Sequence, residues 1–342
     1  MADDRRQTTK EPKGFFNQLK KAIRPGSPQT RSNSPSNIVA QPVETTAPPP
    51  APPAPTVKID REEAAKLRAK YTHFRILVIG RANAGKTTLL KRVCNTTEEP
   101  SIYDEGQNLL EPTAERGIHD VRRSFTFKSN PRFIFHDSRG FEAGGEEEFK
   151  AVMTFIEDST KSKEVGDQIH VIWYCFEPDV SRPLLPLEVK FFNENRVWNV
   201  PVVAIFMKFD VLITKVQGSK ADNKKDIKNA LDILEKKFMQ PLSSYKFYPQ
   251  AYVQFEAINK DNGDHQKQVK KLIKQTAASI DNLALKMLFV TVQQNNLEVS
   301  IEYAVNEYIF SVDKMHNLIV NTSSWFGHCY RMEYVRILCD KN

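Results

Sequence analysis

The 342-residue chain has few cysteines and no long hydrophobic run. Its four cysteines are Cys94, Cys175, Cys329 and Cys339, and none of them stands in a CxxC or Cys/His ligand spacing. This pattern argues against a disulfide scaffold and a zinc module, and it favours a reducing intracellular compartment. No apolar run reaches the roughly 18 residues that span a bilayer, and the mixed charges at the N-terminus are unlike a signal peptide. We therefore expect a cytoplasmic protein.

The chain also lacks a strong net charge beyond its first 70 residues. Residues 1–70 hold 13 Lys and Arg against 7 Asp and Glu, which accounts for +6 of the formal net charge of +7. A nucleic-acid-binding face needs clustered positive charge. We therefore expect no nucleic-acid partner for the folded part of the chain.

Composition divides the chain into three parts. Residues 1–59 form a basic, proline-rich arm, which is predicted to be disordered because it has too few large apolar residues to offset the entropy of folding. Residues 60–281 are predicted to form the main domain, beginning with a short helix over residues 60–71. Residues 282–342 are rich in apolar side chains. They are predicted to form a helical extension that either packs on the domain or is presented to a partner or a membrane, and packing is the favoured alternative.

One segment of the arm has an amphipathic pattern. Within residues 13–24, Phe15, Phe16, Leu19 and Ile23 fall on one side of a helix, and cations flank them. Such a helix can hold weakly to an anionic membrane surface or dock in a partner's groove. The alternative is an idle arm, because about 12 residues are marginal for a helix in water. The first interpretation predicts a peripheral location at membranes.

The clearest motif follows a short apolar run at residues 74–79. The sequence Gly80-Arg-Ala-Asn-Ala-Gly-Lys-Thr87 matches GxxxxGK[ST] between a predicted strand and a predicted helix, as a phosphate-binding loop requires. Its glycines permit the tight backbone that directs amides at phosphate oxygens. Lys86 is placed to bind the outer phosphates, and the Thr87 hydroxyl to bind Mg²⁺. The predicted nucleotide contacts here are Gly80, Asn83, Ala84, Gly85, Lys86, Thr87 and Thr88.

A second apolar run, over residues 131–137, ends in the DxxG motif Asp137-Ser-Arg-Gly140. At the end of a strand, the Asp137 carboxylate is placed to hold Mg²⁺ through its water shell. The Gly140 amide is placed to contact a γ-phosphate and to sense its hydrolysis. This motif predicts a nucleoside triphosphate as the ligand.

A third apolar run, over residues 202–207, leads into Lys208-Phe-Asp210, which resembles NKxD with Met207 in place of asparagine. The Asp210 carboxylate can accept hydrogen bonds from N1–H and the exocyclic amine of guanine, whereas adenine presents an acceptor at the first position. Lys208 would lie along the base. Losing the asparagine removes a hydrogen bond between loops, which bears on affinity more than on base choice. Ala257, after a predicted strand over residues 252–256, would direct its amide to the guanine O6.

In this order, these motifs resemble the Ras-like superfamily of P-loop GTPases over about residues 74–280. The resemblance implies a three-layer α/β/α G domain with a mostly parallel sheet and a nucleotide at the carboxyl ends of its strands. The segment Asp137-Ser-Arg-Gly-Phe141 is most similar to septins, to immune-associated and chloroplast-import-receptor GTPases, and to fungal G-domain proteins. The family also implies a switch I threonine that completes the Mg²⁺ ligands, for which Thr113 is the best-placed candidate.

Phe141 bears on the rate of hydrolysis. Ras-type enzymes place a glutamine there, which orients the attacking water, and a phenyl ring cannot form that hydrogen bond. We therefore expect slow hydrolysis, with Lys86 and Thr113 as catalytic residues and another group in place of the glutamine. The candidates for that group are Arg139, Glu142, Glu115, Arg116 and a residue of a second subunit or partner.

The expected function is a slow GTPase switch that binds GTP, GDP and Mg²⁺. The alternative is a scaffold that binds GTP or GDP with negligible hydrolysis and dimerises across the nucleotide face. A P-loop kinase or ATPase would leave Lys208 and Asp210 unexplained. The expected partners are a guanine nucleotide and either a protein effector or a second copy of the chain.

Overall fold

The computed structural model describes residues 73–110, 120–138, 140, 145–217, 223–261 and 265–292. The chain divides into two units, Met1–Thr56 and Val57–Asn342, and every described residue belongs to the second. The basic arm with its amphipathic segment, the predicted helix over residues 60–71 and residues 293–342 of the extension lie outside the described residues. The domain boundaries at residues 59 and 281 stay predictions.

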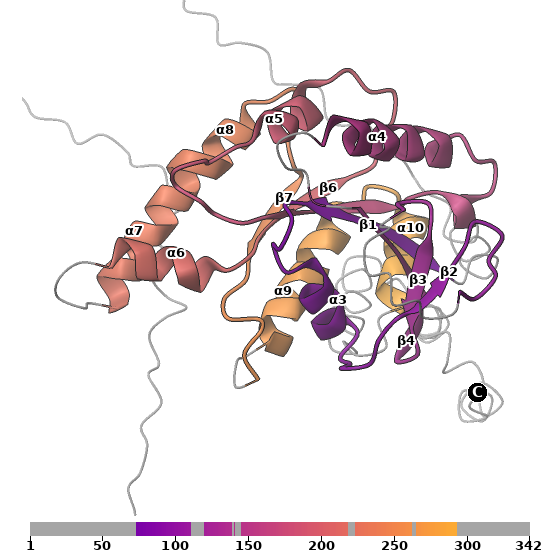
Figure 1. Ribbon diagram of the computed structural model, residues 1–342, viewed down its shortest axis with the longest axis horizontal. Coiled ribbons are helices and arrows are strands. Elements are labelled where there is room, and N and C mark those ends of the chain that lie inside the picture. Colours follow the sequence, from indigo (N-terminus) through magenta and orange to yellow (C-terminus); the bar gives the residue numbers. More distant parts are fainter. Residues whose placement is uncertain are drawn as a thin grey trace, which may run out of the picture. The chain divides into compact units, whose positions relative to one another are not determined.

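A seven-stranded sheet with the order β2-β3-β4-β1-β5-β6-β7 forms the centre of the domain (Figure 1). The strands are β1 (Phe74–Gly80), β2 (Ser101–Tyr103), β3 (Ser124–Phe127), β4 (Asn130–Asp137), β5 (Val171–Phe176), β6 (Val202–Phe206) and β7 (Ala251–Gln254). Strands β4, β1, β5, β6 and β7 are parallel, whereas β3 runs antiparallel to β4 and β2 antiparallel to β3. The predicted α/β class with a mostly parallel sheet is confirmed.

The central strands are apolar because both of their faces are covered. Every residue of β5 and β6 is buried, and strands buried on both faces show nearly continuous apolar runs. The strands predicted over residues 74–79, 131–137, 202–207 and 252–256 are present as β1, β4, β6 and β7. Strands β2 and β5 are not among the predicted ones.

One predicted strand is shorter than expected. We expect a strand over residues 121–127, after the switch I threonine that the family resemblance implies, but β3 begins at Ser124. The reason is a turn: the Asp120 side chain accepts a hydrogen bond from the Arg122 amide at 2.9 Å, and its carbonyl accepts one from the Arg123 amide at 3.0 Å. Aspartate stabilises such turns by bonding its own backbone two residues on, so the strand begins only after the turn.

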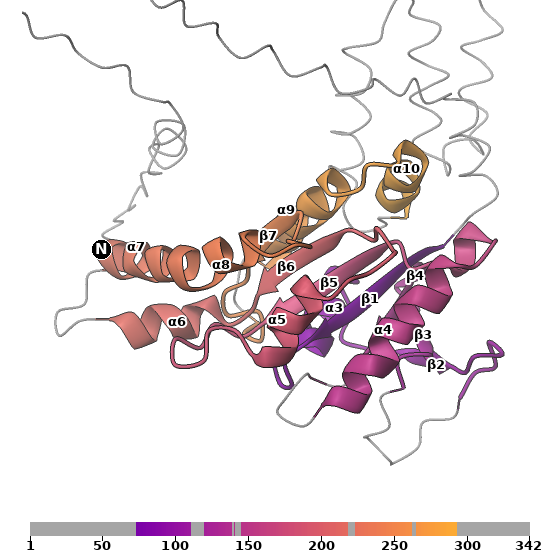
Figure 2. The same cartoon turned by 90° about the horizontal axis from the view of Figure 1, so that it is seen from above.

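Helices cover both faces of the sheet (Figures 1 and 2). They are α3 (Lys86–Val93), α4 (Glu146–Thr160), α5 (Pro186–Asn193), α6 (Phe209–Val216), α7 (Asn223–Leu234), α8 (Gln240–Ser243), α9 (His265–Ala278) and α10 (Leu283–Thr291), with a 3₁₀ turn at Val165–Asp167 and a π-helical turn at Glu235–Met239. Helices α3, α9 and α10 pack on one face, and α4 to α8 pack on the other. The predicted three-layer α/β/α arrangement is confirmed.

The C-terminal extension begins with a helix that packs on the sheet. The Asn282 side chain caps α10, because its Oδ1 atom accepts a hydrogen bond from the Leu285 amide at 3.0 Å. The ring of Phe289 lies 4.8 Å from that of Phe74 and 5.9 Å from that of Phe133, centroid to centroid. Through these contacts, the described start of the extension belongs to the core of the domain. None of the described helices is long and apolar enough to cross a bilayer.

Candidate functional site

A tight loop joins β1 to α3 at the carboxyl edge of the sheet. Its backbone has positive φ at Gly80 (132°), Asn83 (56°) and Gly85 (98°). A Cβ atom on Gly80 would lie 2.0 Å from the Cys175 carbonyl oxygen of β5, so a side chain does not fit there. The bend of the phosphate loop therefore depends on glycine at its first position.

Lys86 is the first residue of α3, and its side chain turns back over the loop. Its Nζ atom donates to the Arg81 carbonyl oxygen at 3.2 Å, and only 9% of the residue is exposed. The exposed Thr87 and the partly buried Thr88 follow in the first turn of the helix. A helix N-terminus carries unpaired amides and partial positive charge. The first turn and the ammonium group together favour an anion here.

Asp137 and Gly140 reach the same loop from β4. Asp137 lies in register with Val78 of β1, and the Ser138 amide donates to the Val78 carbonyl at 3.3 Å. A Cβ atom on Gly140 would lie 1.9 Å from the amide nitrogen of Ala82. The backbone of the DxxG motif therefore touches the phosphate loop, and a glycine is required at this contact.

Lys86 and Asp137 are both close enough to Cys175 for their charges to act on its thiol. Burial raises the pKa of the Cys175 thiol to about 12, while Lys86 acts to lower it and Asp137 to raise it. The thiol is therefore neutral at ordinary pH and unsuited to nucleophilic chemistry.

Two oxygen-bearing side chains at this edge suit a magnesium ion. Thr87 offers a hydroxyl in the first turn of α3, and Asp137 offers a carboxylate whose Oδ1 atom is buried. Mg²⁺ prefers oxygen ligands and is commonly held by one or two protein groups together with substrate phosphates and water. Within the described ranges, no group of three or more His, Cys, Asp or Glu side chains forms a metal cluster. The donor set fits Mg²⁺ bound together with a nucleotide.

Met207 lies where the NKxD pattern has asparagine, and it packs against the phosphate loop. It is fully buried, and its Cε atom lies 3.3 Å from the place that a Cβ on Gly85 would take. The loops after β1 and β6 therefore meet through an apolar contact. Lys208, the next residue, has a left-handed backbone (φ 54°), and its Nζ atom donates to Glu177 Oε2 at 2.9 Å.

Asp210 and Ala257 are brought together from the ends of β6 and β7. The Asp210 Oδ1 atom accepts a hydrogen bond from the Ala257 amide at 2.9 Å, and Ala257 has a left-handed backbone (φ 47°). Burial and then the charge of Asp210 raise the pKa of the neighbouring Glu256. The carboxylate and the amide that we predict to contact guanine are therefore neighbours.

Two helices hold the loop after β7 in place. Arg92 of α3 donates to the Ile258 carbonyl at 3.0 Å. Gln268 of α9 accepts from the Glu256 amide at 2.8 Å and donates to the Glu256 carbonyl at 3.1 Å. Sequence reasoning did not identify Arg92 or Gln268, because each acts on a loop that is distant in the chain.

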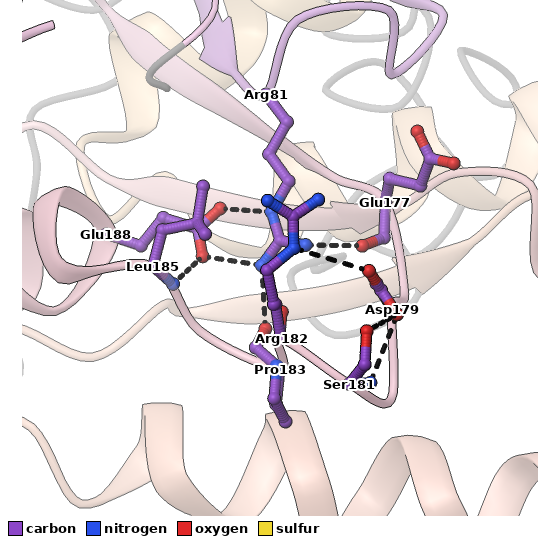
Figure 3. A network of polar contacts seen from close by, with 8 residues as sticks. All are labelled: Arg81, Glu177, Asp179, Ser181, Arg182, Pro183, Leu185 and Glu188. Atoms are coloured by element: carbon purple, nitrogen blue, oxygen red, sulfur yellow. Dashed lines mark hydrogen bonds and ion pairs between the residues drawn. The ribbon is translucent and has the colours of Figure 1, made fainter. Parts of the chain in front are cut away.

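A buried arginine joins the phosphate loop to the segment between β5 and α5 (Figure 3). Arg81 donates through Nε and Nη2 to the two carboxylate oxygens of Glu188, each at 2.8 Å, and Glu188 is fully buried. Burial by itself would lower the pKa of Arg81, but the hydrogen bonds and the attraction to Glu188 raise it. The phosphate-loop motif allows any residue at the position of Arg81, and Glu188 lies 107 residues away in the chain. The motif therefore does not predict this ion pair.

The structure gathers most of the predicted site residues at one edge. The phosphate loop follows strand β1, and the DxxG motif begins at the end of β4. Lys208 and Asp210 follow β6, and Ala257 follows β7, so all of these residues lie at the carboxyl ends of parallel strands. Thr113, Phe141 and the candidate catalytic groups Arg139, Glu142, Glu115 and Arg116 lie outside the described residues. Their roles stay predictions.

Comparisons with known proteins give little further information. No family model matches the chain, and no curated protein matches it. Among solved structures, a probable GTP-binding protein, engB, matches with 19% identity and a TM-score of 0.34, over 60% of this chain and 98% of its own. Mutant S. thermophilus NFeoB bound to GDP·AlF4− matches with 16% identity and a TM-score of 0.34, and bound to GDP with 16% and 0.33, each over 74% of this chain and 76% of its own. Similarity this low carries no argument about function.

Proposed function

We propose that the chain binds GTP and GDP with Mg²⁺ at the carboxyl edge of the sheet and hydrolyses GTP slowly, as a nucleotide-dependent switch. One observation carries the proposal. The phosphate loop touches the DxxG motif at Gly140 and the third motif at Met207, while Asp210 and Ala257 are bonded at the same edge. A chance match to the phosphate-loop pattern would not be expected to bring the other motifs beside it. In open α/β sheets, ligands bind at the carboxyl ends of the strands.

In this proposal, the amides of residues 80–88 and the Lys86 ammonium bind the phosphates. The Lys86 Nζ atom has a neutral carbonyl as its acceptor, and a phosphate oxygen would give a stronger, charge-assisted bond. Thr87, Asp137 and Thr113 would hold Mg²⁺, which when bound neutralises charge on the phosphates. Lys86 therefore has the largest expected effect on nucleotide turnover.

Asp210 and Ala257 would select the base. The carboxylate accepts from guanine N1–H and its exocyclic amine, and the Ala257 amide donates to O6; adenine has an acceptor at N1, no exocyclic group at C2 and an amine donor in place of O6. A carboxylate has about four lone-pair sites, so Asp210 can keep its hydrogen bond to Ala257 and still accept hydrogen bonds from the base. This supports a preference for guanine over adenine nucleotides.

The proposal is tested by phosphate release from the purified chain with GTP and Mg²⁺. The Lys86→Ala variant is expected to lose turnover by about 100-fold or more, because it removes a cation that stabilises transition-state charge. Lys91→Ala is the matched control: Lys91 lies on the same helix and pairs with the exposed Glu99 at 2.8 Å. Its turnover is expected to equal that of the wild type.

Nucleotide binding, measured on the same preparation, distinguishes the GTPase from the alternative functions. Tight GTP binding without turnover would contradict hydrolysis and support the scaffold. Equal competition by ATP and GTP would contradict the assigned roles of Asp210 and Ala257 and support a P-loop kinase or ATPase. Absence of binding to either nucleotide would overturn the whole proposal.

A further inference from the structure

Arg81 belongs to the phosphate loop, but its guanidinium lies outside the loop. It extends into the segment between β5 and α5, where it is only 7% exposed. There it binds Glu188 through two nitrogen atoms and donates to the main-chain oxygens of Glu177 (3.0 Å), Arg182 (3.1 Å) and Pro183 (2.8 Å), as Figure 3 shows. Among the residues that the structure describes, all acceptors of this guanidinium therefore lie within residues 177–188.

Glu177 is a link between two parts of the site. Its main-chain oxygen accepts from Arg81, and its carboxylate accepts from Lys208 Nζ at 2.9 Å. Both members of this ion pair are about one-third exposed, so a polar change at Glu177 leaves no buried charge unpaired. The Lys208 ammonium has no other hydrogen bond in the described part of the chain than this one.

Glu188 fixes the far end of the same segment. Its Oε2 atom accepts from Arg81 and also from the Leu185 amide at 2.7 Å, at the start of α5. One buried carboxylate thus holds both the arginine and the first turn of the helix. The segment is anchored at Glu177 and at Glu188, and both anchors depend on Arg81.

We propose that Arg81 is a positioning residue that couples the phosphate half of the nucleotide site to its base half. Through the Glu177 backbone it fixes the carboxylate that holds Lys208, the residue that we predict to lie along the base. The inference rests on the proposed function, because it needs a nucleotide to be bound. It assigns Arg81 a role in base binding rather than in contact with phosphate.

The first test compares a ligand that has a base with one that lacks it. GDP and inorganic pyrophosphate are titrated against the wild type, Glu177→Gln and Asp179→Asn. Asp179 is the matched control: it lies in the same segment and receives the same chemical change, but its hydrogen bonds go to Ser181 and its ion pair to Arg182.

Glu177→Gln is expected to weaken GDP binding by about 5- to 10-fold, less than the roughly 10-fold or more for removing a buried hydrogen bond to a charged group, because this ion pair is about one-third exposed. Pyrophosphate binding is expected to change by less than about 2-fold, and Asp179→Asn to change neither. A purely structural role would weaken both ligands alike, and that result would overturn the proposal. So would unchanged GDP affinity in Glu177→Gln.

The second test asks whether Arg81 acts through Glu177. Arg81→Lys keeps the charge but cannot bind so many acceptors in one plane, so GDP affinity is expected to fall at least as far as in Glu177→Gln. Because the two residues act in series, the double variant is expected to bind GDP about as weakly as the Arg81→Lys variant. Simple additivity would contradict the coupling.

A failure of the proposed function has a different signature. Wild-type protein that binds pyrophosphate but not GDP would contradict the guanine site itself, before any variant is made. Thermal unfolding of each variant separates loss of fold from loss of binding. If Arg81→Lys does not fold, the comparison of Glu177→Gln with Asp179→Asn still tests the proposal. Both of those residues are partly exposed, so their variants are expected to fold.

Discussion

Arg81 and Arg196 lie at opposite edges of the sheet, and the protein holds their charges in different ways. At the carboxyl edge, two cations are paired with carboxylates: the buried Arg81 binds Glu188 at 2.8 Å, and the partly exposed Lys208 binds Glu177 at 2.9 Å. These pairs join segments that are distant in the chain. They surround the place where we propose that a highly charged ligand binds.

The amino edge holds a half-buried arginine in another way. Arg196 precedes β6, and its Cζ atom lies 4.0 Å from the ring centroid of Trp198 and 4.4 Å from that of Phe247. Its Nε and Nη1 atoms are buried without a hydrogen-bond partner among the residues that the structure describes. The aromatic faces attract the cation, but they do not replace its hydrogen bonds.

The pKa values of the two arginines express this difference. Burial lowers the pKa of Arg196 to about 10, whereas Glu188 more than offsets burial and raises the pKa of Arg81. A buried ion pair is strongly destabilised when one partner is removed, because the other charge remains. A cation on aromatic rings leaves no such charge behind. The carboxyl edge should therefore be the more sensitive to single substitutions.

The largest expected effect follows from breaking the pair at the carboxyl edge. Glu188→Ala leaves the Arg81 guanidinium buried and removes the acceptor of the Leu185 amide. The free energy of unfolding is expected to fall by about 3–5 kcal/mol, measured by urea denaturation. The double variant Arg81→Met/Glu188→Leu should recover most of this loss, since it leaves no unpaired charge. A single variant within about 1 kcal/mol of the wild type would contradict the comparison.

A pH effect is expected at the amino edge. His170, just before β5, accepts a hydrogen bond from the Arg75 amide at Nδ1 (3.0 Å) and therefore donates to the Val165 carbonyl through Nε2 (2.8 Å). This arrangement needs the neutral ring. Burial lowers the pKa of His170 to about 4, the bond to Val165 opposes this, and the charge of Arg75 lowers it further.

The sign of the pH effect follows from the lowered pKa. Above about pH 6.5, the unfolded and folded states both hold His170 neutral, and its full contribution is present. As the pH falls from 6.5 to 4, the unfolded state takes up the proton first, so up to about 3 kcal/mol of stability is lost. In urea denaturation between pH 4.5 and 6, His170→Asn should reduce the pH slope of stability by up to about 1.4 kcal/mol per unit. Equal slopes would show that His170 titrates alike in both states.

The segments of the carboxyl edge differ in how far the sequence predicts them. The phosphate loop is contiguous, and each of its special residues has a local reason, so its bend and its place between strand and helix follow from the pattern alone. Asp210 and Ala257 are predictable only as the ends of two successive strands. Their hydrogen bond depends on the register of β6 and β7, which no local pattern specifies.

The Arg81 network is hidden from sequence reasoning for a physical reason. Pro186 followed by Glu188 is a recognisable start of a helix, so a capping role for Glu188 could have been predicted. Its partner could not, because any arginine of the chain can bind a carboxylate. Arg196 is equally hidden, since the ring of Phe247 reaches it from the segment before β7, about 50 residues further along the chain.

The smallest effect is expected from replacing Arg196. Arg196→Met keeps an apolar stem on Trp198 and Phe247 and removes a half-buried charge whose buried Nε and Nη1 atoms lack acceptors in the described part of the chain. The variant loses a cation–π attraction of about 0.5–2 kcal/mol. This loss is offset because the variant no longer buries polar nitrogen atoms that lack hydrogen-bond acceptors. Urea denaturation should therefore place the variant within about 1 kcal/mol of the wild type, with unchanged GDP affinity. A loss as large as that of Glu188→Ala would mean that the amino edge depends on its arginine as much as the carboxyl edge does.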